Sequence, residues 1–202
     1  MRRTVSAGAA GLGVRDFINM RPNRLPLAIA CLTMGLAPPI GAQEVPAVRV
    51  VLPGYGTPIA IDTILAITNH DASPLRVWTA VARVFDDYHI VPDIRDSLRL
   101  VVGATRYVKS TSMANFTMSA ILECGSSMTG PNADNFRITS ALVAVVRPQP
   151  DGKTVLGIGF IGSGRDVRGV STDPVKCAST GRLEADLANR VRTLLRTPGG
   201  DV

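Results

Sequence analysis

The stretch 137–161, RITSALVAVVRPQPDGKTVLGIGFI, decides the fold of this chain. Both halves are apolar and rich in β-branched residues, and the Asp151-Gly152 pair between them is typical of a β-hairpin turn. One face of the first half is expected to carry Ile138, Leu142, Ala144 and Val146. The stretch therefore predicts an antiparallel hairpin that pairs Arg137–Arg147 with Thr154–Ile161.

An amphipathic helix is predicted on each side of this hairpin. The first begins at Pro74 with Ser73 as its N-cap and runs to about Tyr88. Its apolar stripe is Leu75, Trp78, Val81, Ala82, Phe85 and Tyr88. The second helix begins near Ser179 or Thr180, and its stripe is Leu183, Leu187, Val191 and Leu194.

Four more segments predict strands, namely Val48–Leu52, Pro58–Ile67, Leu98–Lys109 with a bulge or turn at Gly103, and Phe116–Cys124. Strands joined in sequence, with helices at both ends of the run, imply an α+β fold. We expect a single antiparallel sheet of about five to six strands with two helices packed on one face. The predicted domain spans 58–197, after a mobile segment 43–57 and before a disordered tail 198–202.

The N-terminal region predicts export. Residues 25–42, LPLAIACLTMGLAPPIGA, form an uncharged apolar run that follows two arginines and ends in prolines and small residues. We therefore predict a signal peptide, residues 1–42, cleaved after Ala42 or Gln43. Residues 1–19 fit it badly, so we expect Met20 to be the true start and residues 1–19 to be an extension, with Met1 as the alternative. A retained membrane anchor, a twin-arginine leader and lipidation at Cys31 stay open as alternatives.

The charge balance argues against nucleic acid as a partner. The whole chain carries +6, but residues 1–42 hold five Arg and one Asp, which leaves +2 on the mature part. Aromatic residues that stack on bases are few, at 4% of the chain. Arginine greatly outnumbers lysine, which is typical of a GC-rich bacterial genome. With the leader, this predicts a periplasmic or extracellular bacterial protein with no membrane span in its mature part.

The mature chain retains two cysteines, Cys124 and Cys177. In an oxidising compartment such a pair predicts a disulfide, which closes its loop with a stabilisation of about 4 kcal/mol in the chain-entropy model. We expect the bridge to clamp the C-terminal helix to the sheet. Two free buried thiols are the alternative.

Residues 157–162, GIGFIG, match the G-x-G-x-x-G pattern of dinucleotide-binding loops. That site needs the pattern between a strand and an opening helix. Here the glycines fall within a predicted strand, where they more often let another chain segment approach closely. We therefore expect no cofactor.

Two other groups of residues are of types found in metal-binding or catalytic sites. Four carboxylates and one imidazole lie around the end of the first predicted helix: Asp86, Asp87, His89, Asp93 and Asp96. These residue types can bind a metal ion or act as an acid–base pair. The alternative is a solvated helix end. His70-Asp71 with Ser126 or Ser127 suggests a hydrolytic triad, but the chain has no G-x-S-x-G elbow. We assign no catalytic residue.

The polar loop Gly125–Asn135 is the first place where we expect a partner to bind, because function collects on loops held by a rigid scaffold. Its binding candidates are Ser126, Ser127, Asn132 and Asp134. The alternative is a tight turn that the disulfide fixes.

Cys124-Gly125 and Gly130-Pro131-Asn132-Ala133, followed by Cys177 and Thr180-Gly181-x-Leu183-Glu184, resemble uncharacterised exported bacterial proteins. The element order also resembles the helix-on-sheet domains of outer-membrane assembly lipoproteins such as BamC, and this likeness of topology transfers no function. We expect a non-enzymatic envelope domain that binds another macromolecule or scaffolds an assembly. A carrier of a small apolar ligand, with a cavity between helices and sheet, is the alternative, and a hydrolase is the third.

Overall fold

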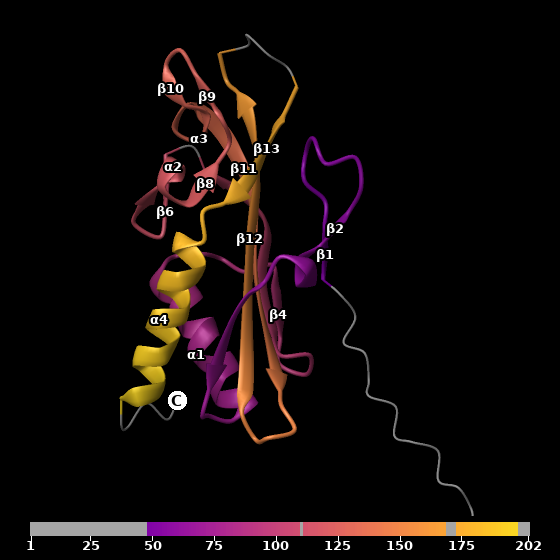
Figure 1. Cartoon of the computed structure of the whole chain (residues 1–202), viewed down its shortest axis with the longest axis vertical. Helices are drawn as coiled ribbons and strands as arrows, with labels where there is room; N and C mark the ends of the chain where they lie inside the picture. Colours follow the sequence, from indigo (N-terminus) through magenta and orange to yellow (C-terminus); the bar gives the residue numbers. More distant parts are fainter. Residues whose placement is uncertain (1–47, 110, 169–172, 198–202) are drawn as a thin grey trace, which may run out of the picture. The chain divides into compact units, whose positions relative to one another are not determined.

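The computed structural model describes residues 48–109, 111–168 and 173–197 (Figure 1). The predicted signal peptide (1–42), both proposed start positions and the predicted tail (198–202) lie outside these ranges. Four α-helices are described: α1 Pro74–Asp87, α2 Met118–Ile121, α3 Asn132–Asn135 and α4 Arg182–Arg196. The described strands and one 3-10 helix are β1 Arg49–Val50, β2 Ile59–Ala60, η1 Ile61–Thr63, β3 Ala66–His70, β4 Ile94–Asp96, β5 Val101–Lys109, β6 Ser112–Met113, β7 Phe116–Thr117, β8 Leu122–Glu123, β9 Ser126–Ser127, β10 Gly130–Pro131, β11 Phe136–Pro148, β12 Thr154–Asp166 and β13 Val175–Ser179.

The predicted hairpin is confirmed as the centre of the sheet. β11 and β12 pair from Phe136↔Asp166 to Pro148↔Thr154 without a register shift. The loop that joins them closes with a 2.8 Å bond from the Gln149 amide to the Lys153 carbonyl, and Gly152 takes a φ of 81° there. Only glycine adopts that conformation at no steric cost, which is why the Asp-Gly pair predicts this turn.

The α+β class is confirmed, but the chain is richer in sheet than predicted. The main sheet has seven antiparallel strands, in the order β4-β5-β11-β12-β13-β8, with β3 beside the first half of β12. The strand pairs β1–β2, β6–β7 and β9–β10 form three further sheets. Strands of two or three residues are too short to show a period in the sequence, so pattern analysis cannot find them.

Helices α1 and α4 contact each other and cover one face of the sheet, as predicted (Figure 1). α4 buries Leu183, Leu187 and Val191, three of the four residues in its predicted stripe. The predicted stripe of α1 was partly wrong, because Leu75 is exposed while Val77 and Val84 are buried. α1 packs against β11 and α4 against β12. On the inner face of β11, Ile138, Leu142, Ala144 and Val146 join the main core cluster.

The opposite face of the sheet is also covered, which the sequence analysis did not predict. Residues 48–65, here called the strap, cross this face with β1, β2 and η1 (Figure 1). The strap and the sheet bury a second apolar cluster: Val50, Leu52, Ile61, Val101, Ala141, Val143, Val145 and Ile161. The uninterrupted apolar run 141–146 is typical of a strand buried on both faces, so the signal was present in the sequence.

Two predicted strands are interrupted. The segment 58–67 turns at η1, so it contributes β2 and the start of β3 instead of one strand. The segment 116–124 contains the one-turn helix α2, in which Met118 and Ile121 are fully buried. Their spacing of three places both on one helix face, whereas the alternate spacing of the whole segment suggested a strand.

The bulge in β5 also differs from its predicted position. Tyr107 pairs with Ser140 and Ala104 with Leu142, so the extra residue lies between 104 and 107 rather than at Gly103. The strand β13 was not predicted. None of the helices in the described ranges combines the length and the apolar character that crossing a membrane requires.

The G-x-G-x-x-G pattern lies inside β12, as predicted, and its first two glycines let the strap approach. A Cβ on Gly157 would stand 2.7 Å from Leu65 Cδ1, and one on Gly159 would stand 2.8 Å from Ile61 Cγ2. Real Cβ atoms essentially never come so close, so a side chain at either position would force the strap residue to shift. The flexible end of Leu65 can move away from position 157, whereas the branched Ile61 at position 159 has less freedom.

We therefore expect Gly159→Ala to lower the free energy of unfolding by about 1–3 kcal/mol, because overpacking forces the buried Ile61 to shift. Gly56→Ala is the matched control, since a Cβ there meets nothing within 4 Å. It should leave stability unchanged or raise it by about 0.4–1 kcal/mol. Denaturant unfolding measures both, and equal stability of the two variants would contradict the role of Gly159.

Candidate binding site at the stapled lobe

Residues 111–135 form a small lobe between β5 and β11, here called the stapled lobe. It consists of short elements: β6, β7, α2, β8, β9, β10 and α3. β8 attaches it to the edge of the main sheet through β13, with Glu123 opposite Ala178. In Figure 1 the lobe lies on the same side of the sheet as α1 and α4, and the strap lies on the other side.

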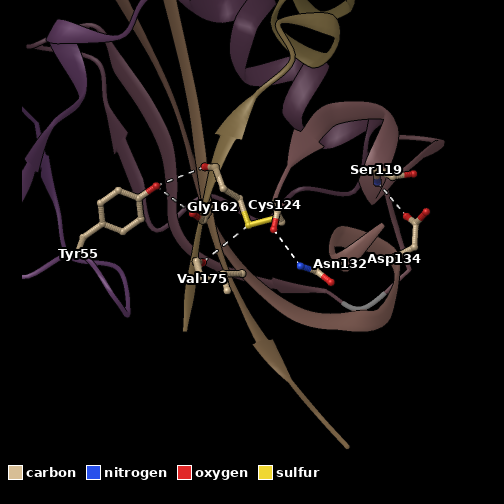
Figure 2. The surroundings of a disulfide bond; sticks show 8 residues. Tyr55, Ser119, Cys124, Asn132, Asp134, Gly162 and Val175 are labelled. Atoms are coloured by element: carbon tan, nitrogen blue, oxygen red, sulfur yellow. Dashed lines mark hydrogen bonds between the residues drawn. A yellow bond between two sulfur atoms is a disulfide. The ribbon is translucent and has the colours of Figure 1, made fainter. Parts of the chain in front are cut away.

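The predicted disulfide is confirmed between Cys124 and Cys177, with Cα atoms 4.2 Å apart (Figure 2). Cys177 is on β13, so the bridge joins the lobe to the sheet edge and does not clamp α4 directly as predicted. From the strap side, the Tyr55 hydroxyl contacts the carbonyl oxygens of Gly162 (3.2 Å) and Cys177 (3.3 Å). Strap, sheet and lobe therefore meet at this bridge.

Two of the predicted binding residues hold the lobe together. The side-chain amide of Asn132 donates to the Cys124 carbonyl at 3.2 Å, and Asp134 Oδ1 accepts from the Ser119 amide at 2.8 Å (Figure 2). Ser126 and Ser127 are exposed in the β9–β10 hairpin. The tip of that hairpin carries Met128, whose side chain is fully exposed at 105%. Met128 is therefore an exposed apolar side chain at a hairpin tip, where a partner protein could contact it.

A pocket of about 280 Å³ lies where the lobe meets the end of α1. Its walls combine polar, charged and aromatic groups: Asp87, Tyr88, His89, Tyr107, Lys109, Ser112, Met113, Ala114 and Asn115. Two of these, Asp87 and His89, belong to the acidic cluster that the sequence analysis singled out. The pocket therefore brings this part of the cluster against the lobe.

Three residues that line the pocket have a left-handed backbone although none is glycine. Ala114 (φ 50°) and Asn115 (φ 66°) form the two-residue turn between β6 and β7, as a type I′ hairpin requires. His89 (φ 55°) follows the end of α1. Such conformations carry a steric cost, and they concentrate at binding and active sites.

The geometry around His89 is that of a Schellman helix end. The His89 amide donates to the Asp86 carbonyl at 3.0 Å, and the Ile90 amide donates to the Phe85 carbonyl at 2.9 Å. Ile90 and Phe85 are both buried, which fixes the end of the helix. Glycine is the usual residue at the His89 position, so the imidazole is kept beside the pocket at a cost in stability.

The aromatic groups of the pocket are held by neighbouring charges. The Tyr88 hydroxyl donates to the Asp186 carboxylate of α4, and the Arg190 guanidinium stands 5.9 Å from the centre of the Tyr88 ring. Burial and the bond to Asp186 raise the pKa of Tyr88, so it remains a neutral donor. Lys109 Nζ stands 5.6 Å from the centre of the Tyr107 ring. The pocket thus offers one carboxylate, one ammonium and one imidazole to a polar ligand.

The other acidic candidates are engaged elsewhere. Asp86 forms an ion pair with Arg95 at 2.8 Å. Asp93 accepts from the amide and the hydroxyl of Thr105, at 2.8 Å and 2.5 Å, and Asp96 Oδ1 accepts from the Leu98 amide at 3.0 Å. Within the described ranges, no three His, Cys, Asp or Glu side chains gather as ligands for a metal ion.

The residues of the imagined triad lie far apart. His70 is buried at the end of β3 opposite Thr154, the first residue of β12, and its Nε2 is 3.1 Å from the Thr68 hydroxyl. Burial first, and then the charge of Arg192, lower the pKa of His70. Ser126 and Ser127 belong to the lobe, whose helix α3 packs near the opposite end of β12. A strand of that length spans about 40 Å.

No protein-family model fits the sequence, and no curated protein aligns with it significantly. The resemblances to exported bacterial proteins and to BamC-type domains therefore stay predictions. The sequence analysis missed Tyr107, Lys109 and Asn115 as pocket residues. The neighbouring Ala114-Asn115 pair was the available signal, because Asn tolerates the left-handed conformation of tight turns.

Replacing both Cys124 and Cys177 with serine should lower the free energy of unfolding by about 4 kcal/mol, because the bridge closes a loop of 53 residues. Amide hydrogen exchange should then show protection lost first in the stapled lobe and β13, with α1 still protected. Uniform loss over the whole domain would contradict the bridge's place between lobe and sheet edge.

Replacing His89 with glycine should raise the free energy of unfolding by about 1 kcal/mol, because glycine relieves the left-handed strain. His89→Ala is the matched control, since it removes the imidazole but keeps the strain, and it should not stabilise the protein. Thermal and denaturant unfolding compare the two variants. A His89→Gly protein that is less stable than His89→Ala would contradict a cost at this position.

Proposed function

We propose that the chain is an exported bacterial envelope protein whose domain binds another macromolecule through the stapled lobe and the pocket at its base. The observation that carries the proposal is this pocket, whose rims hold three non-glycine residues in left-handed conformations. Evolution retains such strain where a geometry is used. The lobe tip supplies an apolar contact at Met128, and the pocket supplies polar and charged groups for a side chain of the partner.

Export is supported by the disulfide, because such bonds form and persist in oxidising compartments. The apolar run 25–42, which resembles a signal peptide, also supports export. We place the mature protein in the periplasm or outside the cell. The role is non-enzymatic in this proposal, since three of the acidic candidates, Asp86, Asp93 and Asp96, are bound to neighbouring groups of the fold.

The alternative, a carrier of a small apolar ligand, has less support. Buried side chains such as Phe85, Phe160 and Leu187 fill the space between the helices and the sheet. Apart from the lobe pocket, an open depression of about 430 Å³ lies on the strap, lined by residues of the segment 51–58. The lobe pocket is lined mainly by polar and charged groups, and the strap depression is open, whereas a carrier encloses an apolar ligand in a mostly apolar cavity.

The proposal is tested by photo-crosslinking in cells. A photoreactive residue replaces Met128 or Asn115 in one set of strains and Leu98 in the control. Leu98 is 96% exposed but precedes β5, whereas the lobe follows the other end of that strand. We expect discrete adducts from positions 128 and 115 and none from 98. Absence of adducts at all three positions, or the same adducts from 98, would overturn the proposal.

A further inference from the structure

The strap face of the sheet carries a group of basic side chains, here called the basic patch: Arg137 of β11, Arg165 of β12 and Lys176 of β13. Arg137 pairs directly with Arg165, and Lys176 pairs with Ser163, two positions before Arg165. Paired residues of antiparallel strands share a face, and so do alternate residues of one strand. All three side chains are exposed. Three neighbouring strands therefore present positive charge on one surface.

This arrangement is unfavourable without an anion. Directly opposed residues have Cβ atoms about 4.5–5.5 Å apart, and like charges in such pairs repel. Among the residues that the structure describes, the ion pairs are Arg95–Asp86 and Arg99–Asp96, so no carboxylate neutralises the patch. A negatively charged ligand would neutralise the patch.

A buried hydroxyl beneath the patch gives an independent indication. Ser163 is 2% exposed, and its Oγ has no hydrogen-bond partner in the described part of the chain. It lies on the same face, between Thr139 and Lys176 in the strand register. Buried hydroxyls normally have a partner, because an unmet one costs about 1–3 kcal/mol. Lys176 Nζ is 5.3 Å from the centre of the Tyr55 ring, so the strap borders this site.

We propose that the basic patch binds a phosphate group. Two guanidinium forks and an ammonium match the several acceptor oxygens and the charge of phosphate better than they match a single carboxylate, and the buried Ser163 hydroxyl lies beside them in the strand register. The register places Arg137 and Arg165 on the face that carries the strap, and the stapled lobe lies on the other side of the sheet (Figure 1). The site therefore does not rest on the proposed function. Inorganic phosphate and an anionic phospholipid headgroup share this chemistry.

The test compares Arg165→Gln with Arg147→Gln in the purified, oxidised protein. Arg147 is a matched control, because it is exposed on the same face of β11 but pairs near the start of β12. Titration calorimetry with inorganic phosphate should show binding by the wild type and by Arg147→Gln. Arg165→Gln should weaken it about tenfold or more, the effect of losing a charge-assisted hydrogen bond. Ser163→Ala should weaken it by a smaller factor.

Vesicles of phosphatidylcholine with and without phosphatidylglycerol form the second arm of the experiment. Binding that needs both phosphatidylglycerol and Arg165 supports the site with a lipid headgroup as its ligand. Binding of inorganic phosphate without vesicle binding supports the site with a free or soluble phosphate. If neither probe binds, or if both arginine variants lose binding equally, the proposal is overturned. Thermal unfolding without phosphate shows that each variant is folded, since removal of one opposed arginine should not lower the midpoint.

Discussion

The pairing of β11 with β12 is the interaction on which the rest of the structure depends. The two strands exchange hydrogen bonds over their full length and are buried on both faces over most of it. On one face they carry α1 and α4, and on the other they carry the strap. Each layer can bury its apolar side only against this hairpin, because neither a strap of two-residue strands nor an isolated helix is stable alone.

The composition of β12 allows this one strand to pack against the helices on one face and against the strap on the other. Its even positions 156–160 are bulky and enter the main core, whereas Gly157 and Gly159 face the strap and leave room for Ile61 and Leu65. A strand with large residues on both faces would hold the strap away from the sheet. Glycine weakens a strand, so the long register with β11 compensates for the propensity that these glycines lose.

Much of this architecture follows from local patterns in the sequence. The hairpin, both long helices and the disulfide are predicted, because the Asp151-Gly152 turn, the 3.6-residue periodicity and the cysteine pair are signals within one segment or one residue type. Strands were predicted around β1 and β2, but the packing of the strap across the sheet, β13 and the short elements of the lobe were not, because they form only by packing against distant residues. The same holds for the pocket, where Tyr107 and His89 come together through tertiary structure alone.

The disulfide explains why the lobe can present a site at all. The lobe is made of elements of two to four residues, so local hydrogen bonds alone would leave it close to fraying. The bridge ties it to β13 at the point where Asn132 and Tyr55 also bond to the two cysteine carbonyls. A covalent tie at that junction lets the lobe keep strained residues such as Ala114 without unfolding. Because the bridge persists only in an oxidising environment, the geometry of the lobe depends on that environment. The proposed location of the protein and its proposed binding site are therefore linked through the disulfide.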